Sequence, residues 1–412
     1  MADICTETEV EKLRIAYITP SLYIAGGVER VLTTKVNYLS AQRDKYDVTI
    51  ILTDGVGKEP FYKLHDNVKV VNLGIDFEEL WALSFFRKIP VYLRKQHLYR
   101  KRLRDELMLL KPNITISTLR REINFLCDIH DGSLKIGEMH VNRQNYRNFE
   151  SNDINWIKRL FAKWWMHRLL TKLKRLDKVV VLTNEDKHSW RDLTNVCVIP
   201  NPLPAIPNKR CSLKEKRVIA VGRYTYQKGF DLLLQAWSRV ETELPDWRLS
   251  IFGSGDRTPY RQLACDLRLD DRRMELCGAT DNIEEEYLQS SIFVFSSRFE
   301  GFGMALLEAM SYGLPSISFD CPCGPKDIID NGVDGVLVKT GDSLALAQAI
   351  TQLARNAEKM MLLSNSSIQT AQKYDIKTIG AQWEDLFNKL LLKFPTFEIP
   401  LYKGISRGCA HL

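Results

Sequence analysis

The strongest constraint on the fold is an alternation of short apolar runs with longer amphipathic segments, which continues through almost all of the 412 residues. Strands that alternate with helices are typical of parallel sheets that are covered by helices on both faces. The sequence therefore predicts an α/β fold with doubly wound parallel sheets. The predicted strands are residues 14–19, 47–52, 68–73, 114–117, 135–138 and 178–183, and then 217–221, 247–252, 273–277, 292–296, 315–319 and 335–338.

A proline-rich interruption divides this alternation into two similar halves. The stretch after residue 198 reads IPNPLPAIP, continues with a lysine-rich segment, and has neither a helical nor a strand period. We therefore expect an N-terminal Rossmann-like domain over 1–198, a linker over 199–216 and a second Rossmann-like domain over 217–378. A C-terminal helix and tail, 379–412, is expected to return to the first domain. Each half opens with a strand that runs into a glycine-containing loop, which predicts a ligand cleft between the domains.

Composition excludes several classes of protein. With 45% hydrophobic and 26% charged residues, the chain is unlike disordered, collagen-like or coiled-coil proteins. No apolar run approaches the roughly 18 residues that a membrane-spanning helix needs. The acidic start, residues 1–11, is also unlike a signal peptide, so we expect a cytoplasmic protein. Nine irregularly spaced cysteines favour reduced thiols over a disulfide framework.

The positive charge is concentrated in two segments of the first half. Residues 87–111 hold nine basic and two acidic residues, and residues 158–178 hold eight basic and one acidic. The second segment has an apolar stripe at helical spacing, so it is either a helix on an anionic membrane or, as we favour, an ordinary Rossmann helix. The first segment follows an aromatic-rich stretch, 80–93, that contains Pro90 and lacks clean periodicity. We predict that this region meets a lipid-linked acceptor or the membrane.

The most informative segment runs from a predicted buried strand through a glycine turn into a helix that ends at Gly313. Free backbone N–H groups near Gly303 and Met304 would form an anion site at the start of that helix. Glu308 lies one turn after Met304 and could take the two ribose hydroxyls of a nucleotide, while Glu300 lies at the mouth of the turn. The alternative is a capped core helix with two solvated glutamates.

Other candidate residues follow predicted strands. Arg223 and Lys228 lie five residues apart around a turn, where two cations can converge on one diphosphate, although both could be ordinary surface residues. Gly26 and Gly27 permit close approach of a ligand to the backbone, but the spacing is not a dinucleotide fingerprint. His140 lies at the carboxyl edge of a sheet, where ligands bind, although a single histidine is more often structural. The absence of any Asp-x-Asp argues against a paired-carboxylate metal site.

These motifs resemble those of retaining glycosyltransferases of family 4, of the bacterial type that builds surface polysaccharides and lipid-linked glycans. The resemblance covers essentially the whole chain and implies the GT-B architecture of two Rossmann-like domains that face a central cleft. The matching motifs are Gly26-Gly27-Val28-Glu29-Arg30, Gly222-Arg223 with Lys228-Gly229, the two glutamates Glu300 and Glu308, and the loop 321–335.

The resemblance implies a role for each candidate residue. The implied roles are diphosphate binding by Arg223 and Lys228, backbone contacts to the diphosphate or sugar from Gly303 and Met304, ribose binding by Glu308, contact with the donor sugar by Glu300 and His140, base contact by Gly278 and Ala279, and approach of Gly27 from the opposite domain.

The function expected from these residues is transfer of a hexosyl or N-acetylhexosaminyl group from a nucleotide sugar to a glycan acceptor. UDP is the expected nucleotide because it is frequent in the family, and the acceptor is expected to be polyprenyl-diphosphate-linked. Arg223 and Lys228 would stabilise the leaving diphosphate beside Glu300, so no metal or other cofactor is expected. No residue is a convincing nucleophile, so the anomeric configuration should be kept by front-face attack.

Two alternatives stay open at this stage. One is a sugar-nucleotide epimerase with the same fold, and the other is a non-catalytic protein that binds membranes through its basic segments. Peripheral contact with the inner face of the cell membrane is compatible with the glycosyltransferase and with both alternatives. No nucleic-acid partner is expected, because the chain outside the two basic segments carries net negative charge.

Overall fold

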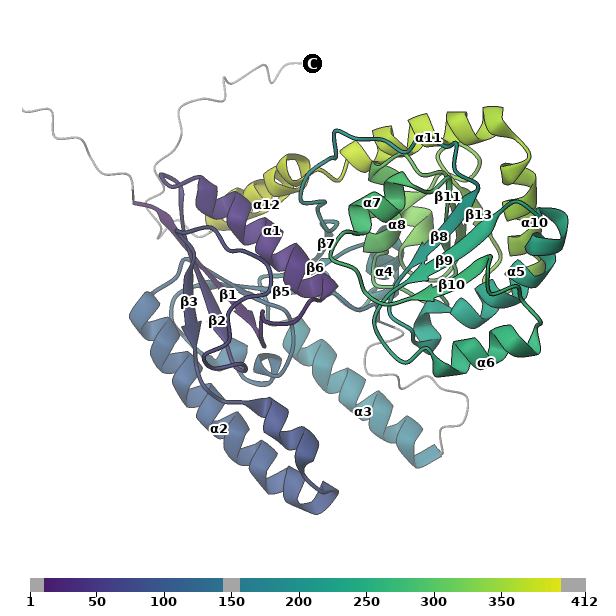
Figure 1. Cartoon of the computed structure of the whole chain (residues 1–412). Helices are drawn as coiled ribbons and strands as arrows, with labels where there is room; N and C mark the ends of the chain where they lie inside the picture. Colours follow the sequence, from purple (N-terminus) through teal and green to yellow (C-terminus); the bar gives the residue numbers. More distant parts are fainter. Residues whose placement is uncertain (1–10, 144–155, 394–412) are drawn as a thin grey trace, which may run out of the picture. The chain divides into compact units, whose positions relative to one another are not determined.

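The computed structural model of the protein describes residues 11–143 and 156–393 (Figure 1). By their contacts these residues form two compact units. Unit 1 comprises residues 11–138, 172–178 and 380–393, and unit 2 comprises 139–143, 156–171 and 179–379. The chain therefore passes between the units more than once.

The first sheet has seven strands in the order β3-β2-β1-β4-β5-β6-β7. The pairs β1–β2, β1–β4, β2–β3, β4–β5 and β6–β7 are parallel. Because consecutive strands are parallel, each must be joined by a crossover, which explains the helices between them. The strands are β1 Leu13–Thr19, β2 Tyr46–Leu52, β3 Lys69–Asn72, β4 Ile114–Ser117, β5 Leu134–Glu138, β6 Lys178–Val181 and β7 Val196–Val198.

The second sheet has six parallel strands in the order β10-β9-β8-β11-β12-β13. The predicted α/β fold with two doubly wound parallel sheets is confirmed. Only β7 was missed, since its three residues are too few to show a period. The strands are β8 Arg217–Val221, β9 Arg248–Phe252, β10 Met274–Cys277, β11 Ile292–Phe295, β12 Ser316–Phe319 and β13 Val336–Val338.

Helices cover both sheets, and four short 3₁₀ segments lie in the loops of the described residues (Figure 1). The α-helices are α1 Gly27–Ala41, α2 Phe85–Leu110, α3 Trp156–Leu173, α4 Asn184–Ser189, α5 Phe230–Glu243, α6 Thr258–Asp266, α7 Ile283–Leu288, α8 Met304–Ser311, α9 Pro325–Ile328, α10 Ser343–Ala354, α11 Ala357–Gln372 and α12 Ile376–Leu391. The 3₁₀ segments are η1 Phe77–Ala82, η2 Glu122–Asn124, η3 Leu126–Asp128 and η4 Tyr226–Lys228.

The second sheet is buried on both faces, which explains why its strands read as continuous apolar runs. Alternate residues of β11 belong to different cores: Ile292 and Val294 to one, Phe293 and Phe295 to the other. The first core contains residues of α5 and α10, and the second contains residues of α8. Burial on both faces fixes the sheet firmly beneath the loops that leave its carboxyl edge.

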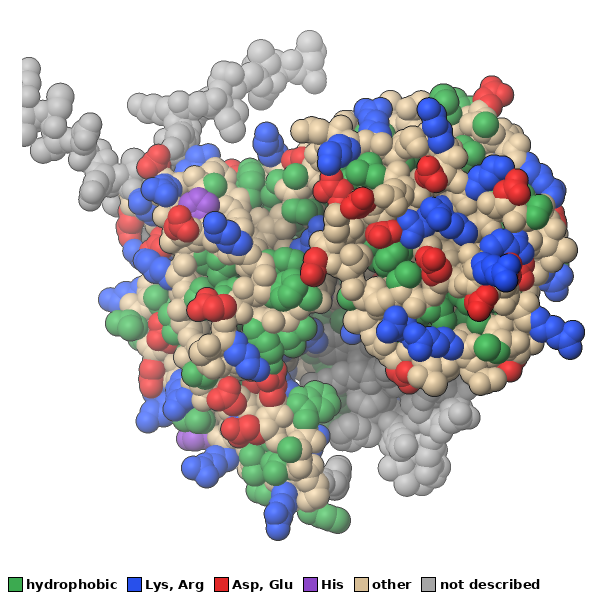
Figure 2. Space-filling view, in the orientation of Figure 1, with side chains coloured by type: hydrophobic (Ala, Val, Ile, Leu, Met, Phe, Trp, Pro, Cys, Tyr) green, Lys and Arg blue, Asp and Glu red, His purple; other side chains and the backbone are tan. Residues whose placement is uncertain are grey.

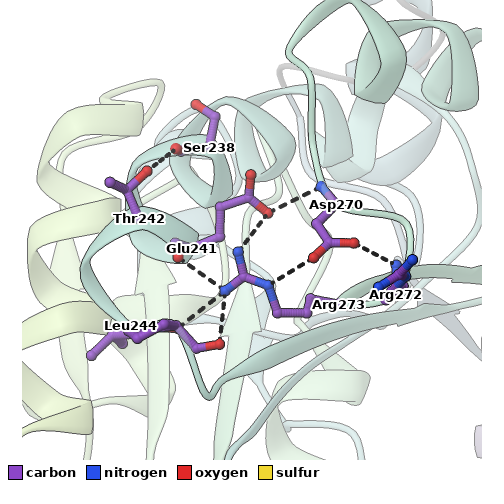
Figure 3. Close-up of polar contacts among 8 residues, drawn as sticks. Ser238, Glu241, Thr242, Leu244, Asp270, Arg272 and Arg273 are labelled. Carbon is purple, nitrogen blue, oxygen red and sulfur yellow. Dashed lines mark hydrogen bonds and ion pairs between the residues drawn. The ribbon is translucent and has the colours of Figure 1, made fainter.

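The carboxyl end of α5 is capped by an arginine from the turn before β10 (Figure 3). Arg273 Nη1 donates to the carbonyl oxygens of Glu241 at 2.9 Å and Pro245 at 3.0 Å, and its Nε donates to Asp270 Oδ2 at 3.3 Å. The last carbonyls of a helix lack partners within the helix, so this side chain satisfies groups that would otherwise need water. The contact fastens the start of β10 to α5.

A buried ion pair lies between α1 and β5 in unit 1. Lys35 Nζ donates to Glu138 Oε1, and both side chains are almost fully buried. The ammonium also lies 4.7 Å from the ring centroid of Trp383 on α12. Glu384, the next residue, accepts hydrogen bonds from Tyr38 at 3.0 Å and from Gln42 at 2.8 Å. The described part of α12 after residue 379 therefore packs on α1.

The two basic helices each have one end that is buried and one that is not. In α2 the buried residues are Tyr99, Leu103 and Leu107, one helical face of its second half. The helix continues through Pro90, contrary to the irregular excursion expected for residues 80–93. Pro90 is tolerated because it lies near an exposed helix end, where the carbonyl that loses its N–H partner can bond to water.

In α3 the interpretation as an ordinary Rossmann helix fits only the second half. Leu169 and Leu173 are buried, whereas Leu160 and Trp164 are exposed. Ile157 and Phe161 were part of the predicted apolar stripe, and their side chains are not among those that the structure describes.

Candidate functional site

The loop after β8 is held against the end of β11 by a glycine. Gly229 has φ +61°, and a Cβ built on it would lie 2.1 Å from the carbonyl oxygen of Ser296. Only glycine adopts this conformation and approaches so closely without strain. The Ser296 hydroxyl in turn donates to the carbonyl of Lys228 at 2.9 Å. The sheet order places β8 beside β11, so these segments meet although almost 70 residues separate them.

Arg298 fixes the same loop from the other side, and its role was missed by the sequence reasoning. Its guanidinium forms a forked pair with Asp231, at 2.7 and 2.5 Å, and also donates to the carbonyl of Tyr226 at 2.8 Å. Burial raises the pKa of Asp231, but the hydrogen bond and charge of Arg298 outweigh burial and leave that pKa below its usual value. The sequence signal for this pair was weak: Asp231 lies in the first turn of α5, and Arg298 follows β11.

Lys228 and Glu300 form an ion pair at the centre of the site. Lys228 Nζ lies 2.6 Å from Glu300 Oε1, and the side chains are only 15% and 8% exposed. The ammonium also lies 5.2 Å from the ring centroid of Phe295. The neighbouring Gln227 donates through Nε2 to the carbonyl of Phe299 at 3.1 Å. The structure therefore brings together two residues that the sequence placed in separate motifs.

The turn at Glu300 also meets the segment after β5, within unit 2. Asn142 Nδ2 donates to the carbonyl of Glu300 at 2.7 Å. A Cβ on Gly301 would lie 2.4 Å from the carbonyl oxygen of His140, so this backbone approach requires glycine. The predicted site residue His140 is thus adjacent to the turn that carries Glu300. Asn142, which orients this turn, was missed because a lone asparagine gives no sequence signal.

The helix start predicted as an anion site is the N-terminus of α8, which follows a glycine turn. Gly303 is the N-cap of α8 and has φ +106°, a value that favours glycine. Met304 and Glu308 are partly exposed, whereas Leu306, Leu307, Ala309, Met310 and Ser311 are buried. The two predicted ligand residues therefore share the open face of α8, one turn apart.

The loop 321–335 packs against this turn. Glu300 N–H donates to the carbonyl of Pro322 at 3.3 Å, and a Cβ on Gly324 would lie 2.2 Å from the carbonyl oxygen of Phe302. Cys321 and Cys323 are buried free thiols. Burial, reinforced by the Glu300 carboxylate, raises the pKa of Cys321, and burial raises that of Cys323 to about 12. Both thiols are therefore neutral near pH 7 and support the loop by packing.

The ends of β8, β9 and β10 are linked by glycines. A Cβ on Gly253 would lie 1.7 Å from the carbonyl oxygen of Gly222, and Gly253 N–H donates to the carbonyl of Gly278 at 3.2 Å. Gly278 and Ala279 form an exposed turn after β10. Arg223, next to Gly222, is exposed, and its guanidinium has no hydrogen bond or ion pair with any residue in the described ranges. A cation without a protein partner at the carboxyl edge of a sheet is available for a ligand.

Gly27 belongs to unit 1, where it is exposed as the first residue of α1. A Cβ built on it would meet no atom within 4 Å. Nothing within unit 1 therefore requires glycine at this position. Its predicted approach to a ligand bound by the other domain stays a prediction, as does the cleft between the domains.

Within residues 11–143 and 156–393, no group of three or more His, Cys, Asp or Glu side chains is arranged to hold a metal ion. Among the helices described, none has both the length and the apolar character needed to cross a bilayer.

Comparison with known proteins agrees with this architecture. Residues 215–356 match the family described as Glycosyl transferases group 1. An uncharacterized glycosyltransferase of Haemophilus influenzae is 27% identical over 380 residues, which cover 90% of this chain and 99% of that protein. The Campylobacter jejuni enzyme named GalNAc-alpha-(1->4)-GalNAc-alpha-(1->3)-diNAcBac-PP-undecaprenol alpha-1,4-N-acetyl-D-galactosaminyltransferase is 24% identical and covers 90% of this chain and 97% of that enzyme.

The solved structures show the same fold. A mutant form of TarM from S. aureus, in complex with fondaparinux, alpha-GlcNAc-glycerol and UDP, superposes with a TM-score of 0.71. It is 16% identical, and the match covers 91% of this chain and 100% of that one. The chain therefore has the GT-B fold, its similarity to glycosyltransferases extends along most of its length, and its residues 215–356 match the group 1 glycosyl transferases.

Proposed function

We propose that this protein transfers a hexosyl or N-acetylhexosaminyl group from a UDP-sugar to a lipid-linked glycan acceptor, with retention of configuration and without a metal. The observation that carries the proposal is the Lys228–Glu300 ion pair, which lies beside the N-terminus of α8 on a firmly held turn. Arg223 adds an exposed cation at the same edge of the sheet. These features support a site for a diphosphate next to a sugar.

In the proposed reaction the bond between the anomeric carbon and the diphosphate oxygen breaks while the acceptor oxygen bonds to the same face of that carbon. Negative charge develops on the leaving diphosphate, where Arg223, Lys228 and the helix N-terminus stabilise it. The leaving phosphate oxygen takes the proton of the acceptor hydroxyl. Lys228 would exchange part of its contact with Glu300 for the diphosphate, which leaves the Glu300 carboxylate to orient the sugar.

The remaining predicted contacts are with the nucleotide and sugar. We propose that Glu308, one turn along the open face of α8, binds the ribose, and that the backbone at Gly303 and Met304 contacts the diphosphate or sugar. The exposed turn of Gly278 and Ala279 would contact the base. His140 would face the donor sugar beside the Glu300 turn, and Gly27 would approach from the other domain.

UDP is proposed because the S. aureus TarM structure contains it. A thermal-shift panel of UDP-, GDP- and ADP-sugars tests this, because a ligand that binds the native state raises its stability. We expect the UDP-sugars alone to raise the melting temperature, and Glu308→Ala to reduce that shift. A Glu308→Ala variant with full turnover would count against the ribose assignment. NMR of the products separates transfer from the alternative, an epimerase, which would release a new nucleotide sugar without an acceptor.

A lipid-linked acceptor is proposed because the name of the Campylobacter relative includes an undecaprenol diphosphate. The exposed residues of α2 and the adjoining η1 supply a surface for it, at the inner face of the cell membrane. Trp81 is 78% exposed and Phe86 86%, and Leu93 lies two turns after Phe86 on the same face. Figure 2 shows hydrophobic side chains with lysines and arginines beside them at the end of unit 1 where α2 begins in Figure 1. Aromatic and basic side chains together suit an anionic membrane interface.

The test of this surface should spare Arg102, which the sequence grouped with Arg100, Lys101 and Arg104. Arg102 Nη1 donates to the carbonyl of Gly74 at 2.9 Å and also to that of Leu73, so it holds α2 to the loop after β3. We expect the triple change Arg100→Ser, Lys101→Ser and Arg104→Ser to weaken sedimentation with anionic liposomes. Unchanged liposome binding together with unchanged activity on lipid acceptors would refute the proposal.

A further inference from the structure

A pocket of about 590 Å³ lies in unit 1, and its lining includes none of the residues proposed to bind the donor. Its lining includes Leu52, the last residue of β2, and Leu22 in the loop after β1, at the edge of a parallel sheet where ligands bind. Tyr23 and Phe61 also line it. Tyr23 belongs to the loop that continues to Gly27 at the start of α1. The volume is within the range of small-molecule sites.

The walls of this pocket are fixed by specific contacts. The N–H of Phe61 donates to the carbonyl of Leu22 at 2.8 Å, which ties the two loops together. Tyr23 donates through its hydroxyl to Glu78, and Lys58 Nζ lies 3.9 Å from the centroid of the Tyr23 ring. Gly55 has φ +75°, and a Cβ there would lie 2.5 Å from the Tyr23 ring, so glycine makes room for the ring. Such a wall is preorganised.

The lining chemistry indicates the class of ligand. Phe61 is 54% exposed and lies edge-on to Tyr62, another lining residue, with 5.0 Å between the ring centroids, so the pocket has an aromatic surface that is open to a ligand. The same pocket is lined by two residues with an ammonium group, Lys58 and Lys63, and two with a carboxyl group, Asp54 and Glu59. Both kinds of group suit hydroxyls, which donate as well as accept hydrogen bonds. A lipid chain would bury these charges without partners, and a small anion would meet the two carboxylates.

We infer that this pocket binds one pyranose ring of the acceptor glycan, with the ring packed on Phe61 and its hydroxyls bonded to the charged groups around Tyr23. The inference rests on the proposed function only in calling that glycan the acceptor. Because the Tyr23 loop continues to Gly27, the pocket lies next to the part of unit 1 that is predicted to approach the donor. It would therefore select which acceptor sugar is held for transfer.

The direct test uses the full chain and four probes, the methyl α-glycosides of glucose, galactose, N-acetylglucosamine and N-acetylgalactosamine. Saturation-transfer NMR at millimolar concentration should show ring-proton contact for at least one of them. We expect Phe61→Ala to weaken that binding about tenfold, which is about 1.4 kcal/mol, because the apolar surface on which the sugar ring packs is removed. Phe61→Tyr should keep it. Leu362→Ala on α11, which removes a side chain of similar exposure far from the pocket in the sequence, should also keep it.

Two results would overturn the inference: no binding of any of the four glycosides, or equal binding by the Phe61→Ala variant. Transfer activity separates this inference from the proposed function. If transfer occurs but Phe61→Ala leaves the acceptor KM unchanged, the pocket is not an acceptor site while the function stands. If the glycoside binds through Phe61 but no sugar is transferred, the pocket stands while the function fails.

Discussion

The ion pair of Lys228 and Glu300 makes the sharpest prediction, because its two members are proposed to act together on the donor. At 2.6 Å the direct attraction is about 6 kcal/mol for an effective dielectric constant of about 20. Loss of hydration offsets most of this, but removing one partner leaves the other charge buried alone, which costs about 3 kcal/mol or more. We expect Lys228→Met and Glu300→Gln each to destabilise unit 2 by roughly that amount. The double variant should lose less than the sum.

Urea unfolding followed by fluorescence measures these stabilities, and steady-state transfer measures the activities. All three variants should lose about 100-fold or more in kcat, because restoring stability in the double variant does not restore a cation at the leaving phosphate. The control is Lys216→Met, since Lys216 forms a 2.8 Å pair with Asp246 in which both side chains are mostly exposed, and little change is expected. Additive single effects would show that the pair does not couple. A Lys228→Met variant with near-normal kcat would refute the role of the lysine.

Three further predictions concern structure around the site. Gly229→Ala should lower the free energy of unfolding by about 2 kcal/mol or more, because of the left-handed φ and the clash with Ser296. The loss should be smaller for Gly341→Ala, where φ is +83° but the new Cβ would meet no atom within 4 Å. Equal losses in thermal unfolding would show that the clash does not contribute. Arg273→Ala should lower the free energy of unfolding by about 1–2 kcal/mol, because the carbonyl groups at the end of α5 lose their hydrogen-bond donor. The control is Arg272→Ala, which changes an exposed neighbour and should leave stability unchanged. An Arg273→Ala variant of unchanged stability would contradict the capping role. Burial raises the pKa of Cys323 to about 12, so about one Cys323 thiol in 10⁴ is ionised at pH 8. Peptide mapping should therefore find iodoacetamide on the exposed Cys265 long before it appears on Cys323. Similar labelling rates for the two cysteines would refute the burial of Cys323.

Much of the local structure was predictable because it depends on neighbours in the chain. The apolar runs that became β1 and β8 were found within one residue, since burial on both faces imposes a continuous apolar run. The glycine at the start of α8 could be read in the same way, because a left-handed N-cap favours that residue type. Helix α2 was misjudged at Pro90, because the local signal of proline does not reveal that this end of the helix is exposed to water.

The sequence by itself determined the α/β class, the two sheets and the chemical types of the candidate residues. Only the tertiary structure decided that Lys228 pairs with Glu300, that Asn142 holds the Glu300 turn, and that Phe61 and Tyr23 line one pocket. The physical reason is the order of strands. Parallel strands bring their carboxyl ends to one edge, but which ends become neighbours depends on pairing across the sheet, and that pairing is settled by packing between segments far apart in the chain.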